Sequence, residues 1–213
     1  QAAAKAGRIF LPNDSVYVER DAGSTWSSFG PIFPLTPPID SDFSWINQGG
    51  ATISTANGGV YLEAPSTTGN TLRIRKKTAP ATPYVITAMF NPVIHGTAIQ
   101  GYGVLFRQSS DGKLHVFGRQ VQAVNAASYI ITSKYTDAST YSTEYVAGPV
   151  AAFYTPRFFR IADNGTNRIC SLSDDGIHFV QYHTIGRTDF LAADEVGFFV
   201  RDVNGVATGA WIV

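Results

Sequence analysis

The sequence predicts an all-β protein: an antiparallel two-sheet jelly-roll sandwich preceded by a small β-rich N-terminal segment. Two observations on composition and one on turns lead to this prediction. Of the 213 residues, 80 are Val, Ile, Thr, Tyr, Phe or Trp, the types that favour strands. Glu, Lys, Leu and Met together number only 18, which is too few for a mainly helical protein. Short apolar segments alternate with Asp-Gly and Asn-Gly pairs, which are typical of β-hairpins.

The charge balance excludes several classes of partner. The chain has 16 basic and 16 acidic residues, a formal net charge of zero, and only 15% charged residues. A nucleic-acid surface needs an excess of Lys and Arg, so no nucleic acid is expected as a partner. No apolar run approaches the ~20 residues of a transmembrane helix, so no membrane insertion is expected. Cys170 is the single cysteine, which excludes an internal disulfide and a zinc site of clustered thiolates.

Residues 1–40 are predicted to form a β-rich neck and a Pro-rich linker. Short strands are expected at 8–11, 15–20 and 25–29. Residues 30–38 contain four prolines, and a proline lacks the N–H group that the interior of a sheet requires. We therefore expect an extended linker with a boundary near residue 40.

Residues 41–213 are predicted to form the sandwich. Strands are expected at 43–46, 51–54, 60–64, 71–76, 84–90, 102–107, 113–119, 129–134, 157–163, 166–172, 178–183, 195–201 and 209–213. Many short strands joined by hairpin turns, without helical crossovers, favour an antiparallel sandwich. Residues 120–147 are the ambiguous stretch, and their Ser, Thr and Tyr content favours strands and loops over a helix.

The C-terminal part carries a pattern of turns and strands that resembles a known class of module. Arg160-Ile161 and Gly165 are followed by Ser173-Asp174-Asp175-Gly176-Ile177-His178-Phe179 and by Val196-Gly197-Phe198. This pattern resembles concanavalin A-like, laminin G-like sandwich modules, directly over about the last quarter of the chain and in general outline over residues 42–213. The N-terminal segment, with residues 17–26 and the Gly30-Pro31-Ile32 stretch, looks like the neck before such modules in tail and receptor-binding proteins of tailed bacteriophages. The resemblance implies a homotrimeric, glycan-recognising virion component.

Catalysis is not expected from these residues. Retaining glycosidases need two carboxylates at close range, and the sandwich glucanases that the chain resembles place them as Glu-x-Asp-x-x-Glu on one strand. The four glutamates, Glu19, Glu63, Glu144 and Glu195, do not have that spacing. Asp194 and Glu195 are adjacent, which puts them on opposite faces of a strand and favours a solvated turn. No nucleophile-elbow sequence Gly-x-Ser-x-Gly occurs, and the histidines lack the spacing of a metal site.

Calcium is the cation to consider, because some laminin G-like domains bind it. Asp163, Asp174 and Asp175 lie at expected hairpin tips and could offer oxygen ligands. Tight turns favour the same residues for backbone reasons, so turn chemistry is the preferred interpretation and no cofactor is expected. Cys170, Trp45 and Trp211 lie in predicted strands and are expected in the core.

A repeated unit is the first candidate binding surface. Three predicted strands carry Phe-x-Arg: Phe117-Gly118-Arg119, Phe158-Phe159-Arg160 and Phe199-Val200-Arg201. The alternate residues are apolar or small, so the period of two predicts that Phe and Arg share the face opposite the core, joined there by His115. Aromatic rings and guanidinium groups suit a sugar ring, an acidic polysaccharide or a neighbouring subunit. A glycan face, a subunit or intrachain contact, and a register shifted by a bulge all stay open.

Tyrosines of the ambiguous region are the second candidate surface. Tyr141 and Tyr145, with Tyr135 and Tyr154, lie among Ser and Thr in residues 135–155. Loops rich in Tyr and Ser are common recognition surfaces, because tyrosine is amphipathic and costs little entropy to order. Shielding of an edge of the sandwich is the alternative role for these side chains.

The function predicted from these observations is recognition without catalysis. We expect a carbohydrate-binding domain of a tail or fibre-type virion protein, located on the particle surface and assembled as a homo-oligomer, with a trimer favoured. Two alternatives stay open: a structural protein that assembles or decorates a particle without a ligand, and a carbohydrate-binding accessory module of a secreted bacterial glycosidase. The Pro-rich linker fits the accessory module, but the β-rich neck does not.

Overall fold

The computed structural model of the chain divides into two compact units, Gln1–Thr36 and Pro37–Val213. The division falls inside the Pro-rich segment. The residues that the structure describes are 9–10, 17–21, 26–31, 36–55, 59–67, 69–94, 99–122, 128–146, 150–151, 156–203 and 207–213.

The N-terminal unit contains a three-stranded antiparallel sheet. Its strands are β1 (Ile9–Phe10), β2 (Tyr17–Asp21) and β3 (Trp26–Pro31), in the order β1-β2-β3. Strand β3 runs two residues beyond the expected end at residue 29, and Pro31 pairs with Tyr17. A proline is tolerated there because β3 is an edge strand of this sheet and Pro31 is its last residue.

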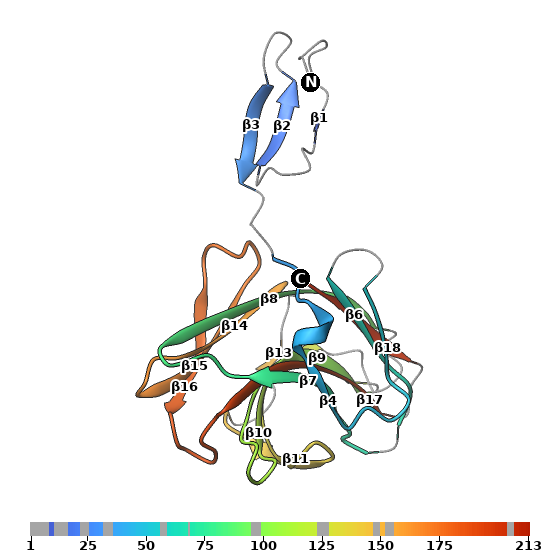
Figure 1. Ribbon diagram of the computed structural model, residues 1–213, viewed down its shortest axis with the longest axis vertical. Helices are drawn as coiled ribbons and strands as arrows, with labels where there is room; N and C mark the ends of the chain where they lie inside the picture. Colours follow the sequence, from blue (N-terminus) through green and yellow to red (C-terminus); the bar gives the residue numbers. More distant parts are fainter. Residues whose placement is uncertain are drawn as a thin grey trace. The chain divides into compact units, whose positions relative to one another are not determined.

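The second unit is a sandwich of two antiparallel sheets (Figure 1), which confirms the predicted fold class. One sheet has eight strands in the order β12-β11-β10-β9-β17-β7-β4, with β13 paired to β11. These strands are β4 (Ser44–Ile46), β7 (Arg73–Thr78), β9 (Ile99–Arg107), β10 (Leu114–Val121), β11 (Ser128–Asp137), β12 (Thr140–Glu144), β13 (Val150–Ala151) and β17 (Glu195–Val203).

The other sheet has seven strands in the order β16-β15-β14-β8-β18-β6-β5. They are β5 (Thr52–Ser54), β6 (Val60–Ala64), β8 (Tyr84–Val93), β14 (Phe158–Asp163), β15 (Asn167–Ser173), β16 (Val180–Gly186) and β18 (Thr208–Ile212). A single 3₁₀ turn, η1 (Asp40–Asp42), is the only helical element in the described part of the chain. None of the described residues forms a helix long and apolar enough to span a bilayer.

The described parts of the ambiguous stretch 120–147 form mainly strands, as its composition favoured. Residues 128–137 are β11 and residues 140–144 are β12, a hairpin partner that the sequence did not predict separately. The pairing of β11 with β12 shifts register on both sides of Tyr135, which bends this hairpin.

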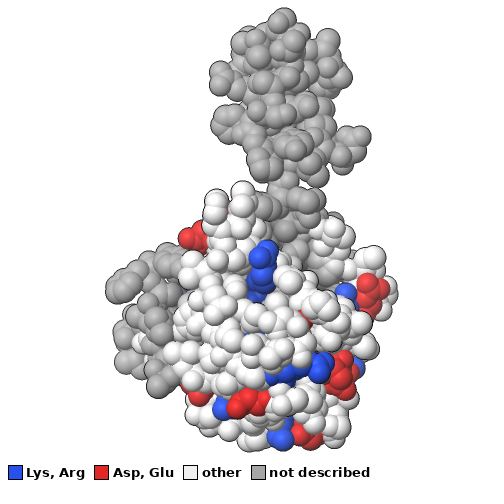
Figure 2. Space-filling view, turned by 90° about the vertical axis from the view of Figure 1, so that its left-hand side faces the viewer, with Lys and Arg blue, Asp and Glu red and all other residues white. Residues whose placement is uncertain are grey.

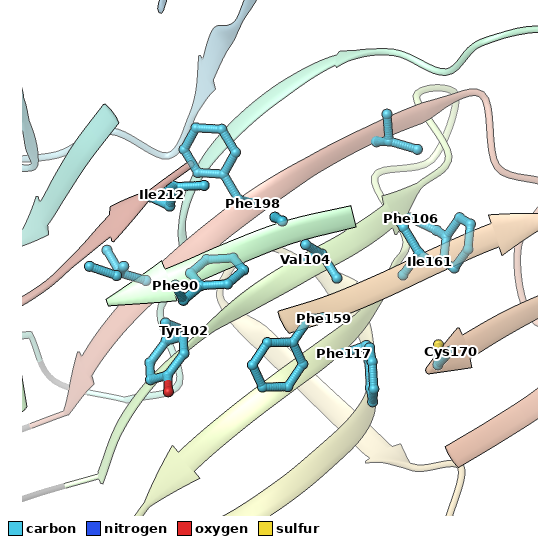
Figure 3. Close-up of a cluster of buried hydrophobic side chains, with 14 of the residues drawn as sticks. Phe90, Tyr102, Val104, Phe106, Phe117, Phe159, Ile161, Cys170, Phe198 and Ile212 are labelled. Carbon is cyan, nitrogen blue, oxygen red and sulfur yellow. The ribbon is translucent and has the colours of Figure 1, made fainter. Parts of the chain in front are cut away.

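The main core lies between the two sheets and is dominated by aromatic rings. Phe90 and Phe159 come from the seven-stranded sheet, and Tyr102 and Phe117 come from the eight-stranded sheet (Figure 3). The rings of Phe117 and Phe159 meet edge to face with centroids 5.4 Å apart, an arrangement that aromatic quadrupoles favour.

A second apolar cluster lies on the opposite face of the eight-stranded sheet. Along β9, Val104 and Phe106 belong to the main core whereas Leu105 between them belongs to the second cluster. The same alternation on β17 sends Phe199 to the second cluster. Its members are Leu72, Ile74, Leu105, Leu114, Val116, Ile131, Tyr135, Ala138 and Phe199.

The eight-stranded sheet curls over this second cluster. The amide of Leu72, just before β7, donates to the carbonyl of Ala138 in the β11–β12 turn at 2.8 Å, although these segments belong to distant strands of the sheet. Asn47 Nδ2 donates both to Leu72 O and to Ser139 Oγ. These hydrogen bonds of Leu72 and Asn47 enclose one face of the sheet as a second interior.

Gly118 permits close packing in the middle of the sheet, because a Cβ there would collide with the carbonyl oxygen of Tyr102.

Candidate functional site

The Phe-x-Arg unit of β10 faces the interior of the sandwich. Phe117 and His115 are fully buried, and Arg119 is half-buried, with its Nε donating to Ser128 Oγ at 2.6 Å. The three side chains do share one face, but the prediction that this face lies opposite the core is wrong, because Phe117 packs in the main core. Val116, which was expected to face the core, instead lies in the second cluster, so both faces of β10 are covered.

His115 lies in a polar cluster within the core. Its Nδ1 lies 3.4 Å from Nη1 of Arg168, and its ring centroid lies 4.5 Å from that of Tyr145 and 6.0 Å from that of His183. Burial and then the positive charge of Arg168 lower the pKa of His115 well below its usual value. Cys170 is buried beside it, as expected, and burial raises the pKa of its thiol.

The unit on β17 lies in the second cluster and holds the curled sheet together. Phe199 is fully buried, and Arg201 is only 3% exposed. The Arg201 guanidinium donates to Tyr135 OH, to Gln120 Oε1 and, at 3.3 Å, to Asn70 Oδ1. Phe199 and Arg201 do lie on the face opposite the main core, as predicted, and the β11–β12 hairpin covers this face, which is the intrachain contact left open above.

The unit on β14 is the one that lies on an outer face. Phe158 is 4% exposed, because the turn containing Gly176 packs on its ring. Arg160 is half-buried; its Nε donates to Thr87 Oγ1 at 2.9 Å, and its guanidinium carbon lies 3.4 Å from the ring centroid of Phe179. Of the three predicted arginines, Arg160 therefore belongs to an accessible surface on the seven-stranded sheet.

The two candidate tyrosines lie in different environments. Tyr141 on β12 is 40% exposed and touches the ring of Tyr135 edge to face. Tyr145 is half-buried: its hydroxyl donates to Asp189 O at 3.2 Å and accepts from Arg168, and burial raises its pKa to about 12. Tyr145 thus shields an edge of the sandwich, the alternative role considered above, and Tyr154 lies outside the described residues.

The three candidate calcium ligands act as turn and core residues. The Asp163 carboxylate is buried and accepts from Arg187 Nε at 2.8 Å and from Gly165 N at 2.9 Å. Hydrogen bonds, foremost from His178, hold the pKa of Asp175 far below its usual value, while Asp174 is exposed. Within the described ranges, no group of three or more His, Cys, Asp or Glu side chains is placed to hold a metal ion.

Glu195 also differs from expectation. It is only 8% exposed, and its carboxylate accepts from Lys76 Nζ at 2.5 Å and from Arg107 Nη1. The expected solvated turn is therefore wrong for Glu195, which ties β7, β9 and β17 together. Asp194 beside it is exposed and accepts from the amide and hydroxyl of Ser109.

Two aromatic rings lie low against the outer face of the seven-stranded sheet. Tyr61 of β6 and Trp211 of β18 are directly opposite in the register, and both are half-buried. The end of the Tyr61 ring leans over Gly209, and the indole Nε1 of Trp211 would lie 3.1 Å from a Cβ on Gly59. Each ring therefore covers a residue without a side chain, and the prediction that Trp211 lies in the core is wrong.

Polar and small apolar side chains surround these rings. Asn91 of β8 pairs with Trp211 and is exposed, and Val93, two residues further on, is 47% exposed. Glu63 lies two residues after Tyr61 on the same face and accepts a long hydrogen bond of 3.5 Å from the tyrosine hydroxyl. We call Tyr61, Glu63, Asn91 and Trp211 the aromatic face.

A second group lies on the same side of the sheet, further back along β8. Arg160 pairs with Thr87, four residues before Asn91, and stacks on Phe179. Arg157 is exposed, and its Nη2 reaches Met89 Sδ at 3.4 Å, which places its guanidinium between the Thr87 and Asn91 positions. We call Arg157, Arg160 and Phe179 the arginine end.

Charged residues are few on the side of the sandwich where β14, β15 and β16 lie. Figure 2 views the molecule from the side on which β14, β15 and β16 lie in Figure 1, and most of the described surface there is uncharged. An uncharged surface with partly exposed rings allows stacking against the apolar face of a ligand, with hydrogen bonds from amide and hydroxyl groups around it.

Sequence reasoning missed Tyr61 and Trp211, although one of them left a signal. Residues 60–64 alternate as Val-Tyr-Leu-Glu-Ala, and the structure buries Val60, Leu62 and Ala64. Because successive side chains of a strand point to opposite faces, Tyr61 and Glu63 lie on the open face. No such signal exists for Trp211, because its neighbours Ala210 and Ile212 are apolar in a strand at the end of the sequence.

Comparisons with known proteins give a fold and no family. No family model and no curated protein matches this chain. Among solved structures, a functionally unknown protein from Saccharomyces cerevisiae is similar, with a TM-score of 0.55 at 15% identity over 83% of this chain and 98% of that chain. This likeness shows the fold alone. The chain is a β-sandwich, and membership of the concanavalin A-like class stays an expectation.

Two further solved structures are less similar. The CBM2 module of the evolved Dit of Lactobacillus casei BL23 phage J-1 has a TM-score of 0.46 at 12% identity, over 84% of this chain and 89% of that one. The GH43 protein BlXynB from Bacillus licheniformis has a TM-score of 0.39 at 13% identity, over 96% of this chain but only 45% of its own. Similarity at this level carries no argument about function.

Proposed function

We propose that this chain is a non-catalytic binding module that takes a carbohydrate on the aromatic face. The observation that carries the proposal is the pair Tyr61 and Trp211, whose rings lie low against the sheet and stay partly accessible. Sugar rings have apolar faces edged by hydroxyl groups, so they stack on such rings and hydrogen-bond to amides and carboxylates nearby. Asn91 and Glu63 supply those polar groups beside the rings.

The test removes each ring from the full chain. Trp211→Ala and Tyr61→Ala are each expected to weaken binding to glycans that the native chain retains by roughly tenfold or more, because central aromatic anchors dominate most interfaces. Binding is measured first on a glycan array and then by calorimetry with the best ligand. Circular dichroism and thermal melting show whether each variant keeps its fold.

Tyr141→Ala is the matched control. Tyr141 is an exposed tyrosine of β12 on the other sheet and was itself a candidate from the sequence. If the aromatic face is the site, this variant binds like the native chain. A loss of binding in Tyr141→Ala together with native binding in Trp211→Ala would move the site to the β11–β12 hairpin and overturn the proposal.

We further propose that the module belongs to a tail or fibre-type virion protein of a tailed bacteriophage, on the particle surface and as a homotrimer. What supports this setting is the sequence resemblance of the N-terminal segment, together with the three-stranded sheet β1-β2-β3 that precedes the sandwich in the sequence. Neighbouring genes test the setting, because virion genes occur together. Glycosidase genes beside this one would favour the accessory-module alternative. A full chain that binds no glycan would favour the structural alternative.

A further inference from the structure

Among the described residues, the two guanidinium groups at the arginine end contact neutral groups. Arg160 donates to the Thr87 hydroxyl and stacks on Phe179, and Arg157 Nη2 lies 3.4 Å from the sulfur of Met89. In the described part of the chain, no carboxylate lies within ion-pair distance of either group. Two other partly exposed cations have acidic partners: Lys113 pairs with Asp111, and Arg187 with Asp163. The positive charge of the arginine end is therefore available to a ligand.

The arginine end lies at a short distance from the aromatic face, on the same side of β8. Thr87, Met89 and Asn91 point to one face and mark successive positions on this strand, about 7 Å apart. Arg160 lies beside the first position, the Arg157 guanidinium lies on the second, and Trp211 lies beside the third. A chain molecule that stacks on Trp211 and runs back along β8 passes both guanidinium groups.

From this arrangement we propose that the ligand is an acidic polysaccharide, with one sugar ring on Tyr61 and Trp211 and carboxylate groups of neighbouring sugars at Arg157 and Arg160. The proposal rests on the proposed function and adds the substrate class. Guanidinium groups bind planar carboxylates through paired hydrogen bonds, which are among the stronger polar contacts in proteins. Glu63 lies on the far side of the ring pair and repels acidic groups there, so it sets the direction in which the chain lies.

The experiment compares an acidic ligand with its neutral form on the full chain. The probes are a short oligogalacturonate and the same oligosaccharide with its carboxylates methyl-esterified. The acid is expected to bind about tenfold more tightly than the ester at low salt, and high sodium chloride is expected to remove this advantage. The double variant Arg157→Gln, Arg160→Gln is expected to bind acid and ester equally, while Trp211→Ala loses both. Lys113→Gln, which removes a cation just before β10, keeps the native preference and serves as the control.

The outcomes separate this inference from the proposed function. Equal binding of acid and ester by the native chain overturns the acidic ligand and leaves a carbohydrate site on the aromatic face intact. A preference for the acid that survives in the double variant overturns the role of Arg157 and Arg160. Binding of neither probe, together with a blank glycan array, overturns the proposed function itself.

Discussion

Phe117, Phe158 and Phe199 each begin the same three-residue unit, yet the structure places them in three environments. Phe117 lies between the sheets, Phe199 lies under the curled hairpin, and Phe158 lies on the outer face beneath a turn. The local pattern is identical in the three strands, but period-two alternation shows only which side chains share a face of a strand. Whether that face is open depends on the strands that cover it.

Gly118 gives a prediction at the scale of one residue. Gly118→Ala is expected to lower the free energy of unfolding by about 1–3 kcal/mol, because the added Cβ collides with the carbonyl oxygen of Tyr102 on β9. Backbone atoms of a central strand cannot move aside without disturbing the sheet. Urea unfolding monitored by tryptophan fluorescence measures the change.

A glycine with free space around it provides the comparison. A Cβ on Gly186, the last residue of β16, would have no neighbour within 4 Å. Gly186→Ala is expected to change the free energy of unfolding by less than about 0.5 kcal/mol. An equal loss of free energy of unfolding in the two variants would show that Gly118 is not required for the close approach of β9 and β10.

At the scale of elements, a bulge in β16 builds the polar cluster around His115. Cys170 pairs with His183 and Ser171 pairs with Gln181, so Tyr182 is an extra residue. Tyr182 and the adjacent His183 therefore both turn inward: Tyr182 packs on the main core, and the His183 ring lies 5.0 Å from that of Tyr145. A regular strand would have sent one of the two outward.

This cluster predicts that mild acid destabilises the sandwich. Burial first, and then Arg168, lowers the pKa of both His115 and His183 in the folded chain. The pKa of a histidine in the unfolded chain is about 6.5. Below that pH the unfolded chain binds protons at these histidines and the folded chain does not, so the free energy of unfolding falls as the pH falls. The loss is at most about 1.4 kcal/mol per pH unit for each histidine. Urea midpoints between pH 7.5 and pH 5, in roughly unit steps, measure this loss.

The double variant His115→Gln, His183→Gln isolates the two histidines from other titrating groups. Its urea midpoint is expected to vary less with pH than that of the native chain over the same range. Glu144 acts in the opposite direction, because burial raises the pKa of its carboxyl and protonation then favours the folded state. An unchanged slope in the double variant would assign the acid effect to other residues.

At the scale of the whole molecule, the two compact units predict that the sandwich folds without the neck. A chain beginning at Pro37 retains both sheets and both apolar clusters. Its melting temperature is expected to match that of the sandwich transition in the full chain, measured by calorimetry. Failure of the shortened chain to fold would show that residues 1–36 are needed to complete the sandwich.

The proposed trimer is tested on the same pair of chains. Light scattering of the full chain is expected to give about three times 23.0 kDa, independent of concentration. A unit of residues 1–36 is below the size at which domains usually fold without oligomerisation, so contacts between necks are the proposed source of assembly, and the shortened chain is expected to be monomeric. A monomeric full chain would remove the trimer and favour a free-standing binding module.

Strand positions and fold class were predictable because they depend on local properties. Asp-Gly and Asn-Gly pairs define hairpin turns, and runs of β-branched and aromatic residues define the strands between them. The candidate site was predicted only in part: Arg160 lies on an accessible face, whereas His115, Phe117, Phe199 and Arg201 are buried. The sequence could not separate an open face from an intrachain contact, because alternation shows which side chains share a face and not what covers that face.

The sequence by itself determined that this chain is an antiparallel β protein, which side chains alternate along each strand, and that charge is scarce. Tertiary structure alone decided which faces are open. The β11–β12 turn bonds to Leu72 and Asn47 and so covers one face of the eight-stranded sheet, which buries Phe199 and Arg201. The seven-stranded sheet keeps Tyr61 and Trp211 partly accessible on its outer face. Alternation is a property of one strand, whereas exposure depends on contacts between residues far apart in the sequence.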